Sequence, residues 1–467
     1  MDETKTYDVA ILGSGPGGYV AAIRAGQLGL KTVVVEKHEL FGGTCLHVGC
    51  IPTKALLYTA ELLDKIREAE TFGIVVENPR LDWAALQKRK ARVVHKLALG
   101  INGLFKKNKV EAVRGFGALV APGTIQVRRE GTVTTVSAEN VILATGSEPR
   151  SLPGLTIDGH TVLTNDEILA LPSQPRSLAV IGAGAVGAEF ASIFASFGTE
   201  VTLIEILPRV LPLEDEEVSE ALARAFRKRR IRCLTSTKVE SVKLLGDEVE
   251  LICKDTSGNT MQLAAEKLLV AVGRKPRTEG IGLEEVGVQT ERGFVKVDGF
   301  MQTSVPGVYA VGDITTSPQL AHVASAEGIV AVEKIAGVAV QPLNYNHMPS
   351  ATYCSPEVAS VGLTEARARE LGHEVRVGRF PFAASSKASI LGENEGLVKI
   401  VAEARYDELL GVHIIGPHAT DLIAEACVAL SLEATAEALM RTVHAHPTLS
   451  ESIMEAAHGV GGHPIHA

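Results

Sequence analysis

The sequence predicts an α/β protein of several domains, with two Rossmann-like dinucleotide-binding units followed by a C-terminal α+β domain. Three observations support this prediction. A chain of 467 residues is too long for a single hydrophobic core. A strand, a glycine-rich turn, a helix, a second strand and an acidic residue follow one another twice. From about residue 348 the pattern changes to separate strand-like runs and then a long helical stretch.

The first unit lies at the start of the chain. Its parts are, in order, an apolar strand at 7–12, Gly13, Gly15, Gly18, a helix at about 19–28, a strand at 32–35, and Glu36. In a GxGxxG turn the first glycine allows the tight bend, the second lets a pyrophosphate approach the backbone, and the third lets helix and strand pack closely. The helix N-terminus favours phosphate. We expect Glu36 to accept hydrogen bonds from ribose hydroxyls.

The second unit repeats this arrangement. Its parts are an apolar strand at 178–181, Gly182, Gly184, Gly187, a helix at about 188–197, a strand at 201–204, and Glu205. The first glycine precedes the acid by 23 positions in both copies (13 to 36 and 182 to 205). A lone GxGxxG is weak evidence, but two copies in the same strand–helix–strand setting argue strongly against coincidence.

Later apolar strands close on turns of small residues at 141–146, at 268–273 and at 308–313, the last ending on Asp313. Such turns at the carboxyl ends of parallel strands are where open α/β sheets bind ligands. Two dinucleotides in one chain imply electron transfer between them, and the simplest pair is FAD with a nicotinamide nucleotide.

The cysteines point to redox chemistry. Four are isolated, and we expect them to be small buried hydrophobic residues: Cys233, Cys253, Cys354 and Cys427. Cys45 and Cys50 form a close pair with no further ligands nearby, so we predict no metal site. On a helix they can bridge if the turn is distorted, and a helix N-terminus lowers the pKa of one thiol. Lys54, one turn after Cys50, can stabilise charge on a reduced flavin.

The position of the cysteine pair indicates which nucleotide each unit binds. Only the first unit is followed directly by the pair, and a flavin must lie against a disulfide to exchange electrons with it. We therefore expect FAD in the first unit and the nicotinamide in the second. Glu205 would repel a 2′-phosphate, and Ile206 and Leu207 are apolar where an NADP site would offer basic residues. The second unit is thus expected to bind NAD, although Arg209 lies nearby.

The segment GGTCLHVGCIPTK at 42–54 resembles the active-site signature of the FAD-dependent disulfide reductases, a family that includes dihydrolipoamide dehydrogenase, glutathione reductase and mercuric reductase. The resemblance extends over both nucleotide units, the segment 312–313 and the segment 444–451. His47 stands where the family usually has Asn, which adds a titratable group beside the pair.

The resemblance implies roles for individual residues. Cys45 would exchange with substrate, Cys50 would contact the flavin, and Lys54 would lie near the flavin N5, paired with Glu189. Further FAD contacts are implied for Gly43, Thr44, Gly117, Thr145, Gly146, Asp313 and Ala321. Further NAD contacts are implied for Glu189, Val239, Ala271 and Gly273.

The catalytic base is expected near the C-terminus, because a dithiol must lose a proton before it attacks a disulfide. An imidazole is suited to this near neutral pH. His446 lies in the stretch whose family counterpart carries the base, and Glu451, five residues later, can hold its ring. His444 is the neighbouring alternative. The last histidines, His458, His463 and His466, are interpreted as part of a glycine-rich polar tail.

We divide the chain into four parts. These are an FAD domain at 1–150, an NAD domain at 151–274, a segment at 275–347 that packs with the FAD domain, and an interface domain at 348–467, in which we expect a long helical stretch from Thr420 to about Val443. In the family the last domain forms a homodimer and delivers the His/Glu pair to the other subunit. The expected reaction is oxidation of dihydrolipoyl groups by NAD. The expected partners are lipoyl domains of 2-oxo-acid dehydrogenase or glycine-cleavage complexes.

Composition restricts the alternatives. A net charge of −9 argues against a nucleic-acid binder. The sequence contains no apolar run of about 18 residues, so no membrane span is expected. The first residues are polar and resemble neither a signal peptide nor a transit sequence, so we expect a cytoplasmic protein. A glutathione reductase would prefer NADPH, which Glu205 disfavours. Mercuric reductase and the large thioredoxin reductases carry an additional C-terminal thiol pair, and this C-terminal sequence has none. A non-enzymatic scaffold subunit is the remaining alternative, which the cysteine pair and His446 argue against.

Overall fold

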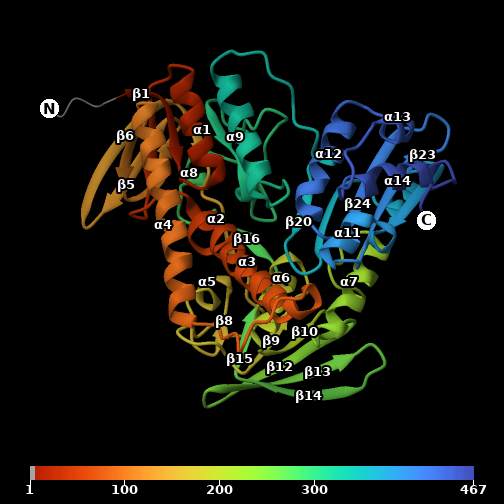
Figure 1. Cartoon of the computed structure of the whole chain (residues 1–467). Coiled ribbons are helices and arrows are strands. Elements are labelled where there is room, and N and C mark those ends of the chain that lie inside the picture. Colours follow the sequence, from red (N-terminus) through yellow and green to blue (C-terminus); the bar gives the residue numbers. More distant parts are fainter. Residues whose placement is uncertain (1–5) are drawn as a thin grey trace. The chain divides into compact units, whose positions relative to one another are not determined.

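The computed structural model describes residues 6–467, and these form two compact units (Figure 1). The first unit contains the residues up to Ala55, Gln87–Arg150 and Arg274–Tyr345. The second unit contains Leu56–Leu86, Ser151–Gly273 and Asn346–Ala467. Both units are therefore assembled from segments that are far apart in the sequence.

The first unit is built on a seven-stranded sheet in the order β3-β2-β1-β6-β5-β4, with β19 pairing to β6. Its strands are β1 Thr6–Leu12, β2 Thr32–Glu36, β3 Glu111–Arg114, β4 Phe116–Ala121, β5 Thr124–Arg129, β6 Thr132–Leu143 and β19 Val308–Ala310. The strands β3, β2, β1, β6 and β19 are paired in parallel, whereas β4 and β5 are antiparallel additions. The short hairpin β17–β18 (Thr290–Glu291, Phe294–Val295) and the pair β7–β16 (Ser147–Pro149, Arg274–Pro276) complete the strands of this unit.

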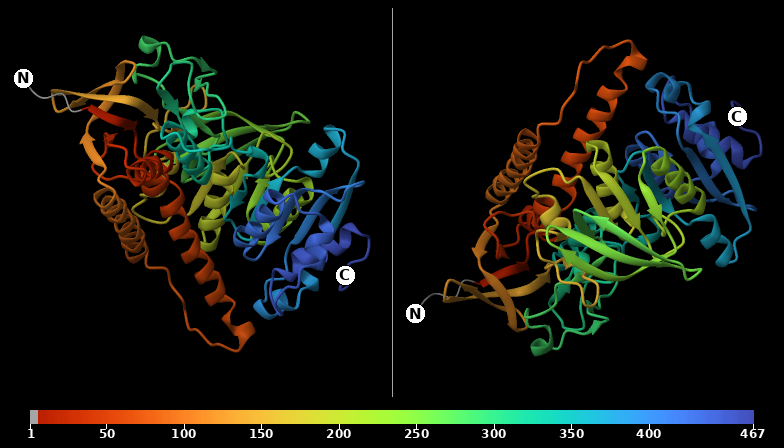
Figure 2. Two further views of the ribbon diagram at one scale, coloured as in Figure 1. Left: turned by 90° about the horizontal axis from the view of Figure 1, so that it is seen from above. Right: turned by 90° about the horizontal axis from the view of Figure 1, so that it is seen from below.

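Helices of the first unit are α1 Pro16–Gln27, α2 Gly43–Val48, α8 Leu283–Val286 and α9 Ala321–Ile335. The helices α1 and α9 cross closely, since a Cβ added at Gly328 would lie 2.6 Å from the carbonyl oxygen of Gly17. Two longer helices run from one unit into the other, namely α3 Cys50–Arg67 and α4 Trp83–Lys107. Figure 2 shows α3 as one unbroken helix, drawn in red-orange.

The second unit contains a five-stranded parallel sheet in the order β11-β10-β9-β15-β8. Its strands are β8 Val162–Leu163, β9 Ser177–Ile181, β10 Glu200–Ile204, β11 Arg232–Leu234 and β15 Lys267–Val270. Helices α5 Asn165–Ile168, α6 Ala185–Phe197 and α7 Glu216–Lys228 connect these strands. An antiparallel sheet of β12 Thr237–Leu245, β13 Glu248–Asp255 and β14 Thr260–Ala265 lies between β11 and β15 in the chain.

The C-terminal part of the second unit is a five-stranded antiparallel sheet in the order β20-β21-β24-β23-β22, with helices packed against it (blue in Figure 2). Its strands are β20 Ser350–Thr352, β21 Glu357–Gly362, β22 Val375–Pro381, β23 Leu397–Glu403 and β24 Leu409–Gly416. Its helices are α10 Glu365–Glu370, α11 Ser386–Leu391, α12 Ala419–Ser431, α13 Ala436–Arg441 and α14 Glu451–Val460. Every residue of β24 is buried, which matches a central strand with helices on its face.

The expected helical stretch from Thr420 to about Val443 is confirmed, and it is divided into two helices, α12 and α13. Glu433 adopts a left-handed conformation (φ 54°), which ends the first helix. Thr435 begins the second, because its side chain accepts a hydrogen bond from the Ala438 N–H at 3.1 Å. Within residues 6–467, no helix is both long enough and apolar enough to cross a membrane.

A buried ion cluster joins α7 to the C-terminal sheet. Lys399 on β23 is only 2% exposed, and its ammonium lies 2.9 Å from Asp215, 2.7 Å from Glu217 and 2.9 Å from Glu365. Arg379 on β22 makes a second ion pair with Glu217. Because a buried ammonium is tolerated only when it is paired, this cluster explains how a lysine can occupy the middle of a hydrophobic strand.

Candidate functional site

The first glycine-rich turn lies between β1 and α1. A Cβ added at Gly13 would collide with the carbonyl oxygen of Ala144, and one added at Gly18 would collide with that of Gly13. These two glycines are therefore required by the protein's own packing. At Gly15 a Cβ would meet nothing within 4 Å, and the Gly15 backbone (φ −64°, ψ −178°) would suit any residue. The space beside Gly15, at the N-terminus of α1, fits an approaching phosphate.

The second turn, between β9 and α6, has the same geometry. A Cβ at Gly182 would collide with the carbonyl oxygen of Ala271, and one at Gly187 would collide with that of Gly182. Gly184 has open space beside it and an ordinary backbone conformation (φ −71°, ψ −175°). Both turns therefore have the shape that the sequence pattern predicts for a pyrophosphate-binding loop.

The acid of the first unit holds the turn. Glu36 is buried, and its carboxylate accepts hydrogen bonds from the Ser14 N–H at 3.0 Å, the Ser14 hydroxyl at 2.6 Å and the His38 N–H at 2.9 Å. A carboxylate has about four acceptor positions, so this leaves little capacity for a ribose. The predicted ribose contact of Glu36 stays a prediction.

The acid of the second unit makes fewer bonds. Glu205 accepts from the Ala183 N–H at 2.7 Å and the Leu207 N–H at 2.9 Å. Arg209, the basic group nearest in sequence, is engaged with Glu216 at 2.7 Å. Ile206 is 62% exposed, so the surface directly after the acid is apolar. These features fit a nucleotide that carries a ribose hydroxyl better than one that carries a 2′-phosphate.

The cysteine pair lies where α2 ends and α3 begins. Cys45 is in α2, Cys50 is the first residue of α3, and Gly49 between the helices has non-helical angles (φ −139°, ψ −120°). A Cβ at Gly49 would lie 2.8 Å from the carbonyl oxygen of Thr44, so this tight break requires glycine. The break brings the two side chains together, and the thiols hydrogen-bond to each other. The structure therefore contains the distorted turn that the sequence predicts.

The pKa of the Cys45 thiol is shifted by its surroundings. The hydrogen bond to Cys50 and burial both raise the pKa of Cys45 well above its ordinary value, and the charge of Lys54 opposes this only in part. The expectation of a lowered pKa therefore does not hold for Cys45.

Two glycines place this junction directly on the first turn. Gly42 donates its N–H to the Ser14 carbonyl at 3.0 Å, and a Cβ at Gly43 (φ 60°) would lie 2.6 Å from the Gly15 Cα. Thr44 follows as the second residue of α2. The His47 ring bonds the Phe41 carbonyl oxygen at 2.9 Å, so this side chain fastens the loop before α2.

Several predicted FAD residues gather at the carboxyl ends of β6 and β19. The Thr145 hydroxyl donates to the Arg277 carbonyl at 2.8 Å, and Gly146 has φ 71°. Asp313 accepts a hydrogen bond from the Ser147 hydroxyl at 2.5 Å. Ala321 is the first residue of α9. Their contacts with FAD stay predictions.

Other predicted contact residues lie in packed strands or strand ends. Gly117 lies in β4, where a Cβ would lie 2.5 Å from Leu12, so core packing alone requires a glycine there. Val239 lies in β12, partly buried against the core of the second unit. Gly273 follows β15 with φ 101°. Their nucleotide contacts also stay predictions.

The structure adds Glu327, which the sequence analysis missed. This residue of α9 is fully buried, and its carboxylate accepts from the Gly312 N–H at 2.6 Å and the Tyr345 hydroxyl at 2.8 Å. Burial raises its pKa. It holds the turn that carries Asp313. The signal available in the sequence was a single acid within the small and mostly apolar run 323–332 of this helix.

The C-terminal histidine and acid are brought together. His446 Nδ1 lies 2.9 Å from Glu451, the first residue of α14, and the imidazole is 70% exposed. Burial opposes ionisation of Glu451, but hydrogen bonds from the Thr448 N–H and His446 lower its pKa overall. The alternative base, His444, is largely buried and bonded to Glu425 at 2.7 Å. Of the two imidazoles, that of His446 is the exposed one.

The interpretation of the last histidines as a polar tail is wrong for His458, whereas His463 and His466 follow the glycines 461 and 462 after α14. His458 lies within α14. His466 bonds the buried carboxylate of Glu455 at 2.7 Å, and Glu455 also accepts the Ile465 N–H at 2.8 Å. The chain end is therefore tied to the helix that begins with Glu451.

The isolated cysteines are partly as expected. Cys253 and Cys354 are buried, whereas Cys233 and Cys427 are half-buried.

Glu189 on α6 is buried and accepts the Tyr353 N–H at 3.0 Å. Lys54 belongs to the first unit and Glu189 to the second, so their pairing stays a prediction.

Comparisons with known proteins identify the family of this chain. Residues 7–328 match the family described as pyridine nucleotide-disulphide oxidoreductase, and residues 348–457 match the dimerisation domain of the same family. A dihydrolipoyl dehydrogenase of Bacillus subtilis (strain 168) is 48% identical over 98% of this chain and 99% of that protein. One of Rhizobium etli is 44% identical over 99% of this chain and 100% of that protein.

Among solved structures, LpdA from Mycobacterium tuberculosis has a TM-score of 0.89 and 29% identity, covering 96% of this chain and 98% of that one. The family model covers both glycine turns and the cysteine pair, and the second model covers the sheet β20–β24 and most of α14. The chain belongs to the pyridine nucleotide-disulphide oxidoreductase family.

Proposed function

We propose that this chain is a dihydrolipoyl dehydrogenase, which oxidises dihydrolipoyl groups with NAD through a cysteine pair and FAD. The observation that carries the proposal is the junction of α2 and α3, where two hydrogen-bonded thiols lie directly after the first nucleotide turn. A second turn of the same geometry favours NAD as the final acceptor, since it has an acid beside it and the nearby Arg209 is paired. Full-length relatives that carry this name support the choice of substrate.

The residues present fit both nucleotides. The open space at Gly15 and the N-terminus of α1 would hold the FAD pyrophosphate, and Gly184 with α6 would hold that of NAD. Glu205 has acceptor capacity left for a ribose hydroxyl. When bound, FAD supplies a two-electron acceptor between the thiols and the nicotinamide.

The protein's own groups carry out thiol exchange. In the oxidised enzyme Cys45 and Cys50 form a disulfide, and His446 takes a proton from the substrate dithiol. The substrate thiolate attacks the Cys45 sulfur, so that the disulfide breaks and Cys50 leaves as a thiolate. The second substrate sulfur then attacks the first, so that the mixed disulfide with Cys45 breaks. Cys45 takes up a proton, and the oxidised lipoyl group is released. The raised pKa of Cys45 agrees with a proton held on that sulfur.

His446 is proposed to act on the disulfide of a second copy of the chain. The dimerisation domain at 348–457 contains His446 and Glu451, and the resemblance to the family implies a homodimer with crossed sites. Glu451 would orient the ring and stabilise the imidazolium that forms. The proposed physiological partners are lipoyl domains of 2-oxo-acid dehydrogenase or glycine-cleavage complexes.

Steady-state rates test the activity. The purified flavoprotein is assayed with dihydrolipoamide, glutathione disulfide and Hg(II), each with NAD(H) and with NADP(H). We expect dihydrolipoamide with NAD to give the highest kcat/KM by a wide margin. A preference for glutathione disulfide with NADPH would overturn the proposal. Absence of flavin absorbance in the purified protein would support a scaffold subunit instead.

Mixed dimers test the crossed site. Neither a Cys50→Ser nor a His446→Gln homodimer should be active. A mixed dimer has one site with both defects and one with neither. Because random mixing makes about half of all dimers mixed, roughly a quarter of wild-type sites should return in the unfractionated mixture. Two affinity tags isolate the mixed species, and activity no higher than that of the mutant homodimers would refute the crossed arrangement.

A further inference from the structure

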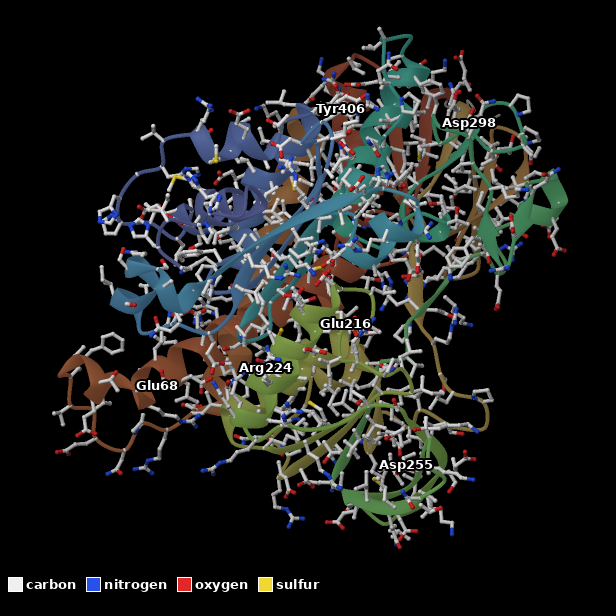
Figure 3. The ribbon with its side chains drawn as sticks, turned by 90° about the vertical axis from the view of Figure 1, so that its right-hand side faces the viewer. Glu68, Glu216, Arg224, Asp255, Asp298 and Tyr406 are labelled. Carbon is white, nitrogen blue, oxygen red and sulfur yellow. The ribbon has the colours of Figure 1, made fainter. Side chains whose placement is uncertain are left out.

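His446 lies in a segment without helix or strand, residues 442–450, which links α13 to α14. From 441 to 447 every residue is exposed except His444, whose side chain is only 7% exposed. Figure 3 shows the C-terminal helices, drawn in blue, with their side chains as sticks. A segment so exposed is held in one conformation only by the few contacts that it makes. The inward side chain of His444 provides such a contact.

Both ring nitrogens of His444 are hydrogen-bonded. Nδ1 lies 2.8 Å from the carbonyl oxygen of Thr442, in the same segment. Nε2 lies 2.7 Å from the carboxylate of Glu425, which belongs to α12. The helix α12 packs its buried residues, among them Ile423 and Ala426, into the core of the C-terminal sheet. The bond from His444 to Glu425 therefore ties the segment 442–450 to a helix that is itself fixed by packing.

These bonds suit an anchor and not a base. A carbonyl oxygen and an ionised carboxylate only accept hydrogen bonds, so both ring nitrogens of His444 act as donors. A ring whose two nitrogens both donate has no lone pair left to take a proton from a substrate. Such a ring also carries a positive charge, and hydrogen bonds between charged groups in largely buried surroundings are stronger than those between neutral groups.

The anchor lies very close to His446 in the chain. Only Ala445 separates His444 from His446, and each residue contributes just two soft backbone dihedral angles. On its other side the His446 ring is held by Glu451, the first residue of α14, at 2.9 Å. Burial raises the pKa of Glu451, but the hydrogen bonds to it lower that pKa overall, and the charge of His444 acts in the same direction. The base is therefore fixed from α12 as well as from α14.

We propose that His444 is a positioning residue for the base His446. Through Glu425 its ring holds the segment 442–450 on α12 and so sets the direction of the His446 imidazole. The inference rests on the proposed function, in which His446 takes a proton from the substrate dithiol. A base must lie within hydrogen-bond reach of the proton that it removes. Loss of the anchor should therefore slow flavin reduction by the dithiol and leave flavin reduction by NADH, which does not use His446.

The test replaces His444 by two amides that each keep one of its bonds. The nitrogen of Gln can take the place of Nε2 and keep the bond to Glu425, whereas that of Asn can take the place of Nδ1 and keep only the bond within the segment. Stopped-flow flavin absorbance measures reduction by dihydrolipoamide and by NADH separately.

In His444→Asn we expect the dihydrolipoamide rate to fall by about ten-fold to a hundred-fold, because misplacement by about 1 Å can cost 10²-fold. His444→Gln should restore most of this rate. Both losses should be smaller than that of His446→Gln, because a general base itself contributes about 10²–10⁴-fold. The NADH rate should stay within about two-fold of wild type in both His444 variants, an order-of-magnitude limit on indirect effects.

His373→Asn is the matched control. His373 lies in the turn between α10 and β22 of the same unit, so this variant makes the same exchange outside the segment 442–450. It should leave both half-reactions unchanged. Glu425→Ala should slow the dihydrolipoamide step about as much as His444→Asn does. Combining these two changes should cost little more than either alone, since both remove the same bond.

The outcomes distinguish this inference from the proposed function. A dihydrolipoamide rate in His444→Asn equal to that of wild type, in protein with normal flavin content, would overturn the inference alone. Equal losses in the Asn and Gln variants would show that the bond to Glu425 is not what matters, and a parallel loss of both half-reactions with a lowered thermal midpoint would show a purely structural role. Either result would also overturn it. Failure of wild-type protein to be reduced by dihydrolipoamide would refute the proposed function and the inference with it.

Discussion

The two nucleotide turns hold themselves together by the same bonds. In each, the residue after the first glycine gives its N–H to the acid of its own unit, from Ser14 at 3.0 Å and from Ala183 at 2.7 Å. In each, the residue six positions beyond the acid also bonds to this turn. Gly42 donates its N–H to the Ser14 carbonyl at 3.0 Å, and Leu211 donates its N–H to the Ala183 carbonyl at 2.8 Å. Two segments with different sequences thus form turns with the same hydrogen bonds.

The turns differ in the segment that comes after that last bond. In the first unit Gly43 continues into α2 and the cysteine junction. A Cβ on Gly43 would lie only 2.6 Å from the Gly15 Cα, so no side chain fits on Gly43. In the second unit Leu211 (φ 44°) leads to α7 instead. The comparison teaches that the two turns share one geometry, whereas the proposed thiol chemistry depends on the segment that follows the first acid.

The largest effect that this difference predicts comes from the segment after the first acid. Cys45→Ser should abolish dihydrolipoamide oxidation and leave FAD bound, because neither glycine turn is touched. Cys50 then remains as a thiolate beside the oxidised flavin, giving long-wavelength charge-transfer absorbance without any reductant. Cys50→Ser should abolish activity and give no such band. Opposite spectra for the two variants would reverse the assignment of the thiols.

The next effect tests whether the turns are equivalent. Gly15→Ala and Gly184→Ala introduce a Cβ where the protein itself leaves space, so folding should be unchanged while a phosphate is displaced. Overpacking and a lost charge-assisted bond together cost about 3–5 kcal/mol, or roughly a hundred-fold or more in affinity. Gly15→Ala should lose FAD, and Gly184→Ala should keep FAD and lose NADH binding.

Gly187→Ala is the control for the glycine pair, because its Cβ would collide with the Gly182 carbonyl oxygen. It should lower the thermal midpoint, whereas Gly184→Ala should not. Flavin content, NADH titration and thermal unfolding measure the three properties. Normal NADH binding by Gly184→Ala would break the equivalence of the two turns.

A smaller effect is expected at the second acid. Glu205→Ala should raise the KM for NADH far more than it lowers kcat, because a ribose contact contributes equally to ground state and transition state. A lost charge-assisted hydrogen bond is worth about 1.5–3 kcal/mol. Steady-state kinetics with NADH and NADPH measure the change. An unchanged KM for NADH would count against the second unit as the nicotinamide site.

The smallest effect lies in the segment after the second acid. The ion pair with Arg379, and then that with Lys399, lower the pKa of Glu217 from 4.5 to about 2. A folded-state pKa below the unfolded value contributes stability above about pH 4.5, and this stability is lost as the pH falls towards 2. Glu217→Gln should therefore destabilise by less than about 1 kcal/mol at pH 6, since Glu217 is partly exposed, and by still less at pH 3. Denaturant midpoints at both pH values measure this, and a constant difference would contradict it.

Local patterns were sufficient to predict the nucleotide turns and the cysteine junction. Each depends on a short stretch whose glycines have one steric reason to be there, such as Gly13 against Ala144. The sequence indicated that the two cysteines can meet only if the turn is distorted, and the structure locates this distortion at Gly49. Strand and helix starts also agreed within a few residues, for example α6 at Ala185 where about 188 was expected.

Contacts between distant residues could not be predicted in this way. The buried Glu327 depends on Gly312 and Tyr345, and the buried Lys399 depends on Asp215, whose positions only the tertiary fold brings together. The end of α12 depends on a single left-handed residue, Glu433, in a sequence with good helix formers on both sides. The raised pKa of Cys45 arises from its partner and its burial, not from the helix end alone.

The pairing of β19 with β6 has a consequence for synthesis on the ribosome. The strand β6 ends at Leu143 and its neighbour β19 begins at Val308, so the 164 residues from 144 to 307 are made between them. At about 5–20 residues per second this takes roughly 8–33 s. During that time the whole sheet β8–β15 of the second unit emerges and can fold, while the first sheet lacks one strand and α9. The part of the protein that begins first is thus completed later, and FAD can enter its finished site only after that delay.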